Sequence, residues 1–275
     1  MPGRGASVAG ASAHARYRRL RAEYRQERVL ARLVLAGVAG SMTAGVFDWL
    51  TGLAAALAAL LLYSFYLRVK PDPVTRWRRG AAAERRTGRR LARLDPAYFH
   101  VLHDRALPMT ERSEGIKKHA AVVTPSDAGG LTKAHANLDH LVIGLTGVYA
   151  IVSRRWPVLT RLRAVDERLW VGPRPMTRLL VTARDAARTV AERLSEDLGH
   201  RVDVHAVVAV HGARPPHTGF VFDGVTVQRA GRTRRFVERR PAVYTTAQVT
   251  AIAAAAERIL PPMIDVWGKT STLRD

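Results

Sequence analysis

The sequence contains no cysteine, a single asparagine and only 23 acidic residues in 275. The lack of cysteine excludes disulfide frameworks, thiolate zinc sites, iron–sulfur clusters and cysteine nucleophiles. The acids face 44 basic residues, so the formal net charge is +21, which favours a polyanionic partner: nucleic acid or an anionic membrane surface. Because only five of the basic residues are lysine, the arginine excess also fits a GC-rich genome, and charge alone does not decide the function.

Apolar residues, in contrast, are abundant at 47% of the chain, which excludes a wholly disordered protein. A nearly unbroken apolar run covers residues 33–67, with Asp48 as its one charged residue. This run is too long for one crossing of a hydrocarbon layer about 30 Å thick. Asp48 and Trp49 suit an interface, so we predict two short transmembrane helices, 33–47 and 50–67, that form a hairpin.

The residues on both sides of the apolar run are strongly basic. Residues 1–32 carry eight arginines against two glutamates, and residues 68–93 carry ten basic residues against two acids. The positive-inside rule therefore places both termini in the cytoplasm, as in a cell-membrane protein with two spans. Two alternatives stay open: a secretory signal peptide, which fits the long charged leader poorly, and a buried core hairpin.

The rest of the chain alternates between helical and strand patterns, which predicts an α/β domain. We expect a basic helix, three strands, a helix ended by Gly199, a buried strand and a closing helix. The first two of these strands are separated by a long polar loop, 108–136. The predicted elements are 76–94, 98–103, 138–143, 148–152, an extended pair within 162–171, 177–198, 202–210, 225–227 and 246–260.

The stretch 137–149 (NLDHLVIGLTGVY) closely resembles the central motif of the NERD, or nuclease-related, domains. Residues 83–87 (AERRT) resemble the opening helix of that family, and residues 101–108 resemble its following strand and turn. The resemblance implies a restriction-endonuclease-like core, a central mixed sheet flanked by helices. The expected organisation is a basic N-terminal segment (1–32), the transmembrane hairpin (33–67), a linker (68–79), the NERD-like domain (80–260, with the 108–136 insertion) and a C-terminal tail (261–275).

The resemblance also implies a divalent-metal site for phosphodiester cleavage, in which carboxylates hold Mg²⁺ and a lysine assists. By position, Glu84 matches the helix acid and Asp139 the strand aspartate. The third element departs from the family pattern, because Val152 stands in place of an acid and Arg154 in place of the lysine. Valine cannot bind a metal and arginine cannot act as a base, so we expect a degenerate site with no cofactor, Mg²⁺ being the alternative.

Two functions from different classes follow from this departure. The first is a membrane-anchored binding or scaffolding module without nuclease activity. The second is an active metal-dependent DNA nuclease whose third carboxylate comes from elsewhere, such as Asp166 or Glu167. In either case the arginines of the basic helix are candidates to bind nucleic-acid phosphates or anionic lipid, and no protein partner can be named. These arginines are Arg85, Arg86, Arg89 and Arg90.

Each candidate residue also has a plain structural explanation. Glu84 lies among arginines, so a surface ion pair would account for it, and Asp139 could simply cap a turn. His140 should point to the opposite face of its strand from Asp139 and serve a structural role. Three further histidines are spaced by six residues, which matches no metal-binding pattern: His205, His211 and His217.

Overall fold

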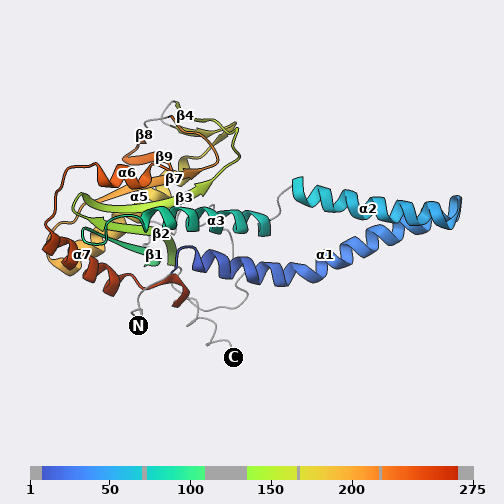
Figure 1. Ribbon diagram of the computed structural model, residues 1–275, viewed down its shortest axis with the longest axis horizontal. Coiled ribbons are helices and arrows are strands. Elements are labelled where there is room, and N and C mark those ends of the chain that lie inside the picture. The colour runs from blue at the N-terminus through green and yellow to red at the C-terminus, as the bar shows by residue number, and fades with distance from the viewer. Residues whose placement is uncertain (1–7, 70–72, 109–134, 166–167, 217–218, 266–275) are drawn as a thin grey trace. The chain divides into compact units, whose positions relative to one another are not determined.

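The computed structural model describes residues 8–69, 73–108, 135–165, 168–216 and 219–265 (Figure 1). By its internal contacts the chain divides into two compact units. One is a helical unit of residues 13–81, and the other is an α/β unit of residues 1–12 and 82–275. The predicted 108–136 insertion lies almost wholly outside the described residues.

The helical unit contains α1 (Ala11–Val46) and α2 (Trp49–Val69), followed by the first part of α3 (Pro73–Leu91). The predicted break at Asp48 and Trp49 is confirmed, since α1 ends at Val46 and α2 begins at Trp49. The Asp48 carboxylate caps α2, because its Oδ1 accepts the backbone N–H groups of Leu50 at 2.7 Å and Thr51 at 2.9 Å. Helix α1 runs through residue 32 without interruption.

Two segments of these helices are long and apolar enough to cross a membrane, Tyr24–Val46 and Trp49–Tyr66. Only 0% and 6% of their residues are buried within the protein, so both segments expose their apolar side chains. The two helices approach closely where small residues face each other. A Cβ placed on Gly52 would lie 2.6 Å from the Ala44 Cβ and 2.7 Å from the Gly40 carbonyl oxygen, so the contact requires glycine.

The α/β unit is built on a six-stranded mixed sheet with the order β1-β2-β3-β7-β9-β8. Strands β1, β2 and β3 form an antiparallel meander, β7 and β9 continue parallel to β3, and β8 closes the edge antiparallel to β9. The strand bounds are β1 (Phe99–Pro108), β2 (His135–Gly144), β3 (Gly147–Arg155), β7 (Val204–His211), β8 (Phe220–Phe222) and β9 (Val225–Arg229).

Helices cover both faces of this sheet, as expected for strands that are apolar on both sides (Figure 1). Helices α5 (Thr177–Leu198) and α7 (Thr246–Ile259) pack on one face, where the larger hydrophobic core lies. The C-terminal part of α3 and α6 (Thr233–Glu238) contribute Leu91 and Val237 to a smaller core on the other face. The predicted α/β fold, a mixed sheet flanked by helices, is confirmed.

Local sequence signals set several of these boundaries. Helix α5 ends at Gly199 as predicted, with φ of 71° and its N–H donating to the Ser195 carbonyl at 3.0 Å. Helix α7 begins with a capping box in which the Thr245 hydroxyl and the Gln248 side chain each accept the other's backbone N–H. The predicted extended pair within 162–171 forms β4 (Leu162–Val165) and β5 (Arg168–Val171), and a further short strand, β6 (Arg174–Pro175), completes a separate three-stranded sheet.

The structure corrects the predicted end of the first strand and adds two elements. Strand β1 continues five residues beyond His103, because Asp104 and Arg105 are buried within the domain although they are charged. Arg105 is 1% exposed and donates to the Leu260 carbonyl at 3.0 Å. Strand β8 and helix α6 were not predicted, since three and six residues are too short to show a periodic pattern.

Candidate functional site

Helix α3 is amphipathic and divides its residues between the domain interior and the surface. Glu84, Thr87 and Leu91 recur at helical spacing and are buried against the sheet. Of the predicted binding arginines, Arg86 and Arg89 are exposed, and Arg85 and Arg90 are half-buried. One helix therefore supplies both an acid that points inward and a basic surface.

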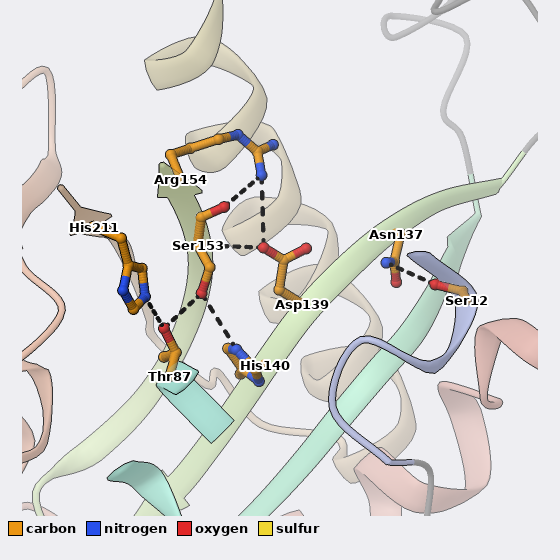
Figure 2. Close-up of polar contacts among 8 residues, drawn as sticks. All are labelled: Ser12, Thr87, Asn137, Asp139, His140, Ser153, Arg154 and His211. Atoms are coloured by element: carbon orange, nitrogen blue, oxygen red, sulfur yellow. Dashed lines mark hydrogen bonds and ion pairs between the residues drawn. The ribbon is translucent and has the colours of Figure 1, made fainter. Parts of the chain in front are cut away.

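Asp139 lies on β2 next to Ser153, which is near the end of β3, and the residue is 5% exposed. Its Oδ2 accepts the backbone N–H of Ser153 at 2.6 Å and lies 3.6 Å from Nη1 of Arg154 (Figure 2). The same Nη1 donates to the Ser153 carbonyl at 2.8 Å, which fixes the guanidinium over the carboxylate. Burial raises the pKa of Asp139, while Arg154 and the Ser153 amide oppose the rise.

Glu84 is 8% exposed, and its Oε2 has no hydrogen-bond partner. Burial, followed by the negative charge of Asp139, raises the pKa of Glu84 to about 9, against the opposing effect of Arg154. Glu84 is therefore protonated at neutral pH. The alternative that Glu84 forms a surface ion pair with neighbouring arginines is wrong, because the side chain points into the domain.

A third carboxylate, Asp104, lies close enough to Glu84 and Asp139 to raise the pKa of both. It is 1% exposed, and its backbone adopts a left-handed φ of 53°. Its Oδ2 accepts the backbone N–H of Ser12 at 2.8 Å, and its Oδ1 accepts the Ser12 hydroxyl. Sequence reasoning missed Asp104 because the strand was predicted to end at His103. The available signal was the antiparallel pairing, in which residues 103 and 105 face residues 140 and 138.

These residues do not fit a divalent metal of the kind that the family resemblance implies. Val152 is 5% exposed and packs in the larger hydrophobic core, so β3 provides no ligand at this position. Arg154 places a positive charge at Asp139, where a cation would bind. Within the described ranges, no three carboxylate or imidazole groups converge in a way that could hold a metal ion. Asp166 and Glu167, the predicted alternative ligands, lie outside the described residues.

A chain of five buried or half-buried side chains crosses the α3 face of the sheet next to these carboxylates, and Figure 2 shows all of them except His103. Nδ1 of His103 lies 2.9 Å from Nδ1 of His140, and Nε2 of His140 lies 3.3 Å from the Ser153 hydroxyl. The Ser153 hydroxyl donates to Oγ1 of Thr87 at 2.9 Å, and Oγ1 of Thr87 lies 2.7 Å from Nε2 of His211. This polar chain thus connects helix α3 to four strands of the sheet, which are β1, β2, β3 and β7.

The direction of one bond in this chain is compatible with a simple arrangement of the next. Because Ser153 donates to Thr87, the Thr87 proton is available for Nε2 of His211, and in that tautomer the His211 proton lies on Nδ1. Burial lowers the pKa of His103 and of His211 to about 4, and it lowers the pKa of His140 as well. All three imidazoles are therefore neutral at pH 7, as a chain of single donors and acceptors requires.

The histidines take structural positions, as predicted for His140. Its ring bonds to the α3 side of the sheet, whereas Asp139 accepts from the β3 backbone. The His205 ring stacks on Tyr149 with centroids 5.4 Å apart. His211 belongs to the polar chain, and His217 lies outside the described residues.

Comparison with known families agrees with this arrangement. Residues 79–211 match the family model described as NERD, nuclease-related domain. No curated protein and no solved structure matches the chain. The matched range begins on α3 and ends at the last residue of β7, so it contains Glu84, Asp104, Asp139, Arg154 and the whole polar chain. Residues 79–211 of this chain are thus similar to the nuclease-related domain of the NERD family, which implies a restriction-endonuclease-like core for the α/β unit.

Proposed function

We propose that this protein is a membrane-anchored module that binds nucleic acid through the arginines of α3, and that its nuclease-related domain does not use a divalent metal. The observation that carries the proposal is the contrast between the two sides of α3. On the inward side, Glu84 keeps its proton and Asp139 has Arg154 beside it. The outward side presents arginines to solvent.

The outward arginines support binding to a polyanion. Arg86, Arg89 and Arg90 form no ion pair with any acid in the described part of the chain. Burial lowers the pKa of Arg90, and the positive charges of Arg86 and Arg93 lower it further, so these cations repel one another. An external anion would relieve this repulsion, and each phosphate bound would release counterions from nucleic acid.

The inward side supports binding without metal-dependent cleavage. The Arg154 guanidinium and the Ser153 amide already compensate the charge of Asp139, and Glu84 keeps its proton at neutral pH. A metal would have to displace Arg154, remove that proton and do without a ligand at Val152. The observation that favours the alternative, a metal-dependent nuclease, is that Asp139 lies close enough to Glu84 for its charge to raise the pKa of Glu84.

The two apolar helices support the membrane anchor, with both flanks in the cytoplasm. Ser12 precedes the first helix segment and Asp104 follows the second, yet these two residues are hydrogen-bonded inside the same compact unit. Two residues in contact must lie on one side of a membrane, so the segments between them must cross it an even number of times. This argument is independent of the basic flanks, and it agrees with the positive-inside rule.

The proposal can be tested with the full chain in nanodiscs of uncharged lipid. Fluorescence anisotropy of a labelled DNA duplex should report binding that weakens steeply as salt is raised. Incubation of plasmid DNA with Mg²⁺ or Mn²⁺ should produce no nicking above that of Asp139→Ala. Nicking that Asp139→Ala abolishes would establish the nuclease instead, and a lack of duplex binding at low salt would refute the binding module.

A further inference from the structure

Two parallel strands in the middle of the sheet, β3 and β7, have their carboxyl ends side by side. Their last residues, Arg155 and His211, are paired in register. The Trp156 N–H donates to the His211 carbonyl at 3.0 Å and holds the two ends together. Ligands of open α/β sheets commonly bind beyond the carboxyl ends of parallel strands, where side chains from several elements converge.

Helix α3 brings two further cations to this point. Thr87 bonds to the His211 ring, Arg86 is its neighbour in sequence, and Arg90 follows Thr87 by three residues on the same side of the helix. Nη2 of Arg90 lies 4.0 Å from the place that a Cβ on Gly231 would occupy, so the turn before α6 approaches this arginine without a side chain between them.

The electrostatics of His211 agree with this placement. Burial is the main cause of the lowered pKa of the His211 imidazole. The positive charges of Arg90, Arg86 and Arg155 lower it further. The nearby acid of α6, Glu238, is already paired with Arg234 at 3.3 Å. Arg86, Arg90 and Arg155 have no acidic partner in the described ranges, so the three positive charges that act on this imidazole are not compensated by an ion pair there.

We propose that Arg86, Arg90 and Arg155, arranged around His211, form a binding site for a phosphodiester group of a nucleic-acid duplex. The site rests on the proposed function and specifies where on the domain it is carried out. Guanidinium groups match phosphate oxygens with paired N–H donors, and in the tautomer in which Nε2 of His211 accepts from Thr87, Nδ1–H adds a neutral donor.

The surroundings favour the backbone of a duplex over unstacked bases. Recognition of single strands relies on aromatic side chains that stack on bases. The aromatic residue next to Arg155 is Trp156, and its side chain packs against the hydrophobic core. The site therefore offers charge and hydrogen-bond donors without a stacking platform, which suits sequence-independent contact with phosphates.

The test compares two triple variants of the full chain in uncharged nanodiscs. The site variant carries Arg86→Gln, Arg90→Gln and Arg155→Gln. The control variant carries Arg163→Gln, Arg168→Gln and Arg174→Gln, which removes the same charge from exposed positions of the small sheet β4-β5-β6. Anisotropy titrations with a labelled duplex are run at several salt concentrations, and circular dichroism verifies that both variants are folded.

We expect the site variant to bind the duplex at least tenfold more weakly, and its salt slope to fall by about one, as for the loss of one phosphate contact, whereas the control changes affinity less than threefold. Equal effects of the two variants would overturn the site and leave the binding module intact. If the wild type does not bind duplex at all, the proposed function itself fails. If the site variant loses binding to anionic vesicles and keeps binding to the duplex, the site belongs to lipid and the inference is wrong.

Discussion

The buried carboxylates show how a nuclease-related site can be neutralised from within. Burial raises the pKa of Asp139, and a guanidinium 3.6 Å away and a short amide bond oppose that rise because they replace part of the water that burial removes. Glu84 has no such partner at Oε2 and takes up a proton instead. The two acids thus differ in their neighbours: Asp139 has a guanidinium and an amide beside it, whereas Oε2 of Glu84 has no hydrogen-bond partner.

Replacing Glu84 should change how stability depends on pH. The pKa of Glu84 is about 9 in the folded chain and 4.5 without its environment, so the folded state binds the proton more tightly. Its stabilising contribution is complete below about pH 4.5 and is lost as the pH rises towards 9. Glu84→Gln should therefore match the wild type at pH 5 and exceed it at pH 8 by on the order of 1 kcal/mol or more.

Chemical unfolding of the detergent-solubilised chain in EDTA measures this difference. Glu196→Gln is the control, since the Glu196 side chain is 68% exposed on α5. The two variants should behave differently at pH 8. An unfolding free energy of Glu84→Gln that follows the wild type from pH 5 to pH 8 would show that Glu84 does not hold a proton in the folded protein.

Thr87 is the residue through which the polar chain connects the sheet to α3. Thr87→Val keeps the shape of the side chain but leaves the Ser153 hydroxyl and Nε2 of His211 without their partner. We expect it to lower the free energy of unfolding by about 1–3 kcal/mol. Thr87→Ser, which keeps the hydroxyl, should cost clearly less. Thermal and urea unfolding compare the two, and equal losses would mean that the hydroxyl contributes nothing.

At the scale of elements, the contact between α1 and α2 depends on small residues at one level of the hairpin. Gly40, Ala44 and Gly52 bring the two backbones together, and the Cβ space at Gly52 is already filled by backbone atoms that cannot move aside. Packing of this kind drives helix association in a membrane, where apolar burial between helices adds little.

Gly52→Leu should therefore separate the hairpin, whereas Gly45→Leu should not, because a Cβ on Gly45 meets nothing within 4 Å. The chain has no cysteine of its own, so a pair introduced as Gly40→Cys and Ala56→Cys reports the contact through disulfide formation. Oxidation should cross-link this pair in the wild-type and Gly45→Leu backgrounds and several-fold less in the Gly52→Leu background. Equal yields in all three would contradict the packing.

At the scale of the whole molecule, residues far apart in sequence are joined on either side of the apolar helices. Residues 1–12 belong to the same compact unit as residues 82–275, and Ser12 is 2% exposed within it. The Asp104 carboxylate accepts from the first turn of α1, where backbone N–H groups have no partners within the helix. The α/β unit therefore includes a piece of chain that precedes the two apolar helices.

The proposed topology predicts which sides of a membrane are accessible. Single cysteines at Val8, Phe47 and Val221 would each replace an exposed residue, with 71%, 75% and 70% of the side chain accessible. In intact cells a membrane-impermeant maleimide should label Phe47→Cys alone, and all three positions should react after permeabilisation. Labelling of Val8→Cys in intact cells, or none at Phe47→Cys, would contradict a hairpin with both flanks in the cytoplasm.

The sequence by itself determined the features that depend on neighbouring residues. Asp48 ended one apolar helix and began the next, Gly199 ended α5, and the glycines at both ends of the turn 144–147 revealed the β2–β3 hairpin that carries Asp139. Each signal acts through hydrogen bonds or apolar patterns within a few residues, so it can be recognised without the fold. The family motif added Glu84 and Asp139 to the candidate site, and the pattern of the same motif showed that Val152 departs from it.

Only the tertiary structure decided what surrounds those residues. The Asp104–Ser12 bond spans 92 positions, the Thr87–His211 contact 124 and the Ser153–Thr87 bond 66. No local pattern encodes such pairs, because their partners meet only when the sheet register and the α3 packing are set. The same long-range packing buried Glu84, which its arginine neighbours suggested would lie at the surface. Ionisation depends on burial and on the nearest charges, so the state of this site was fixed by the fold.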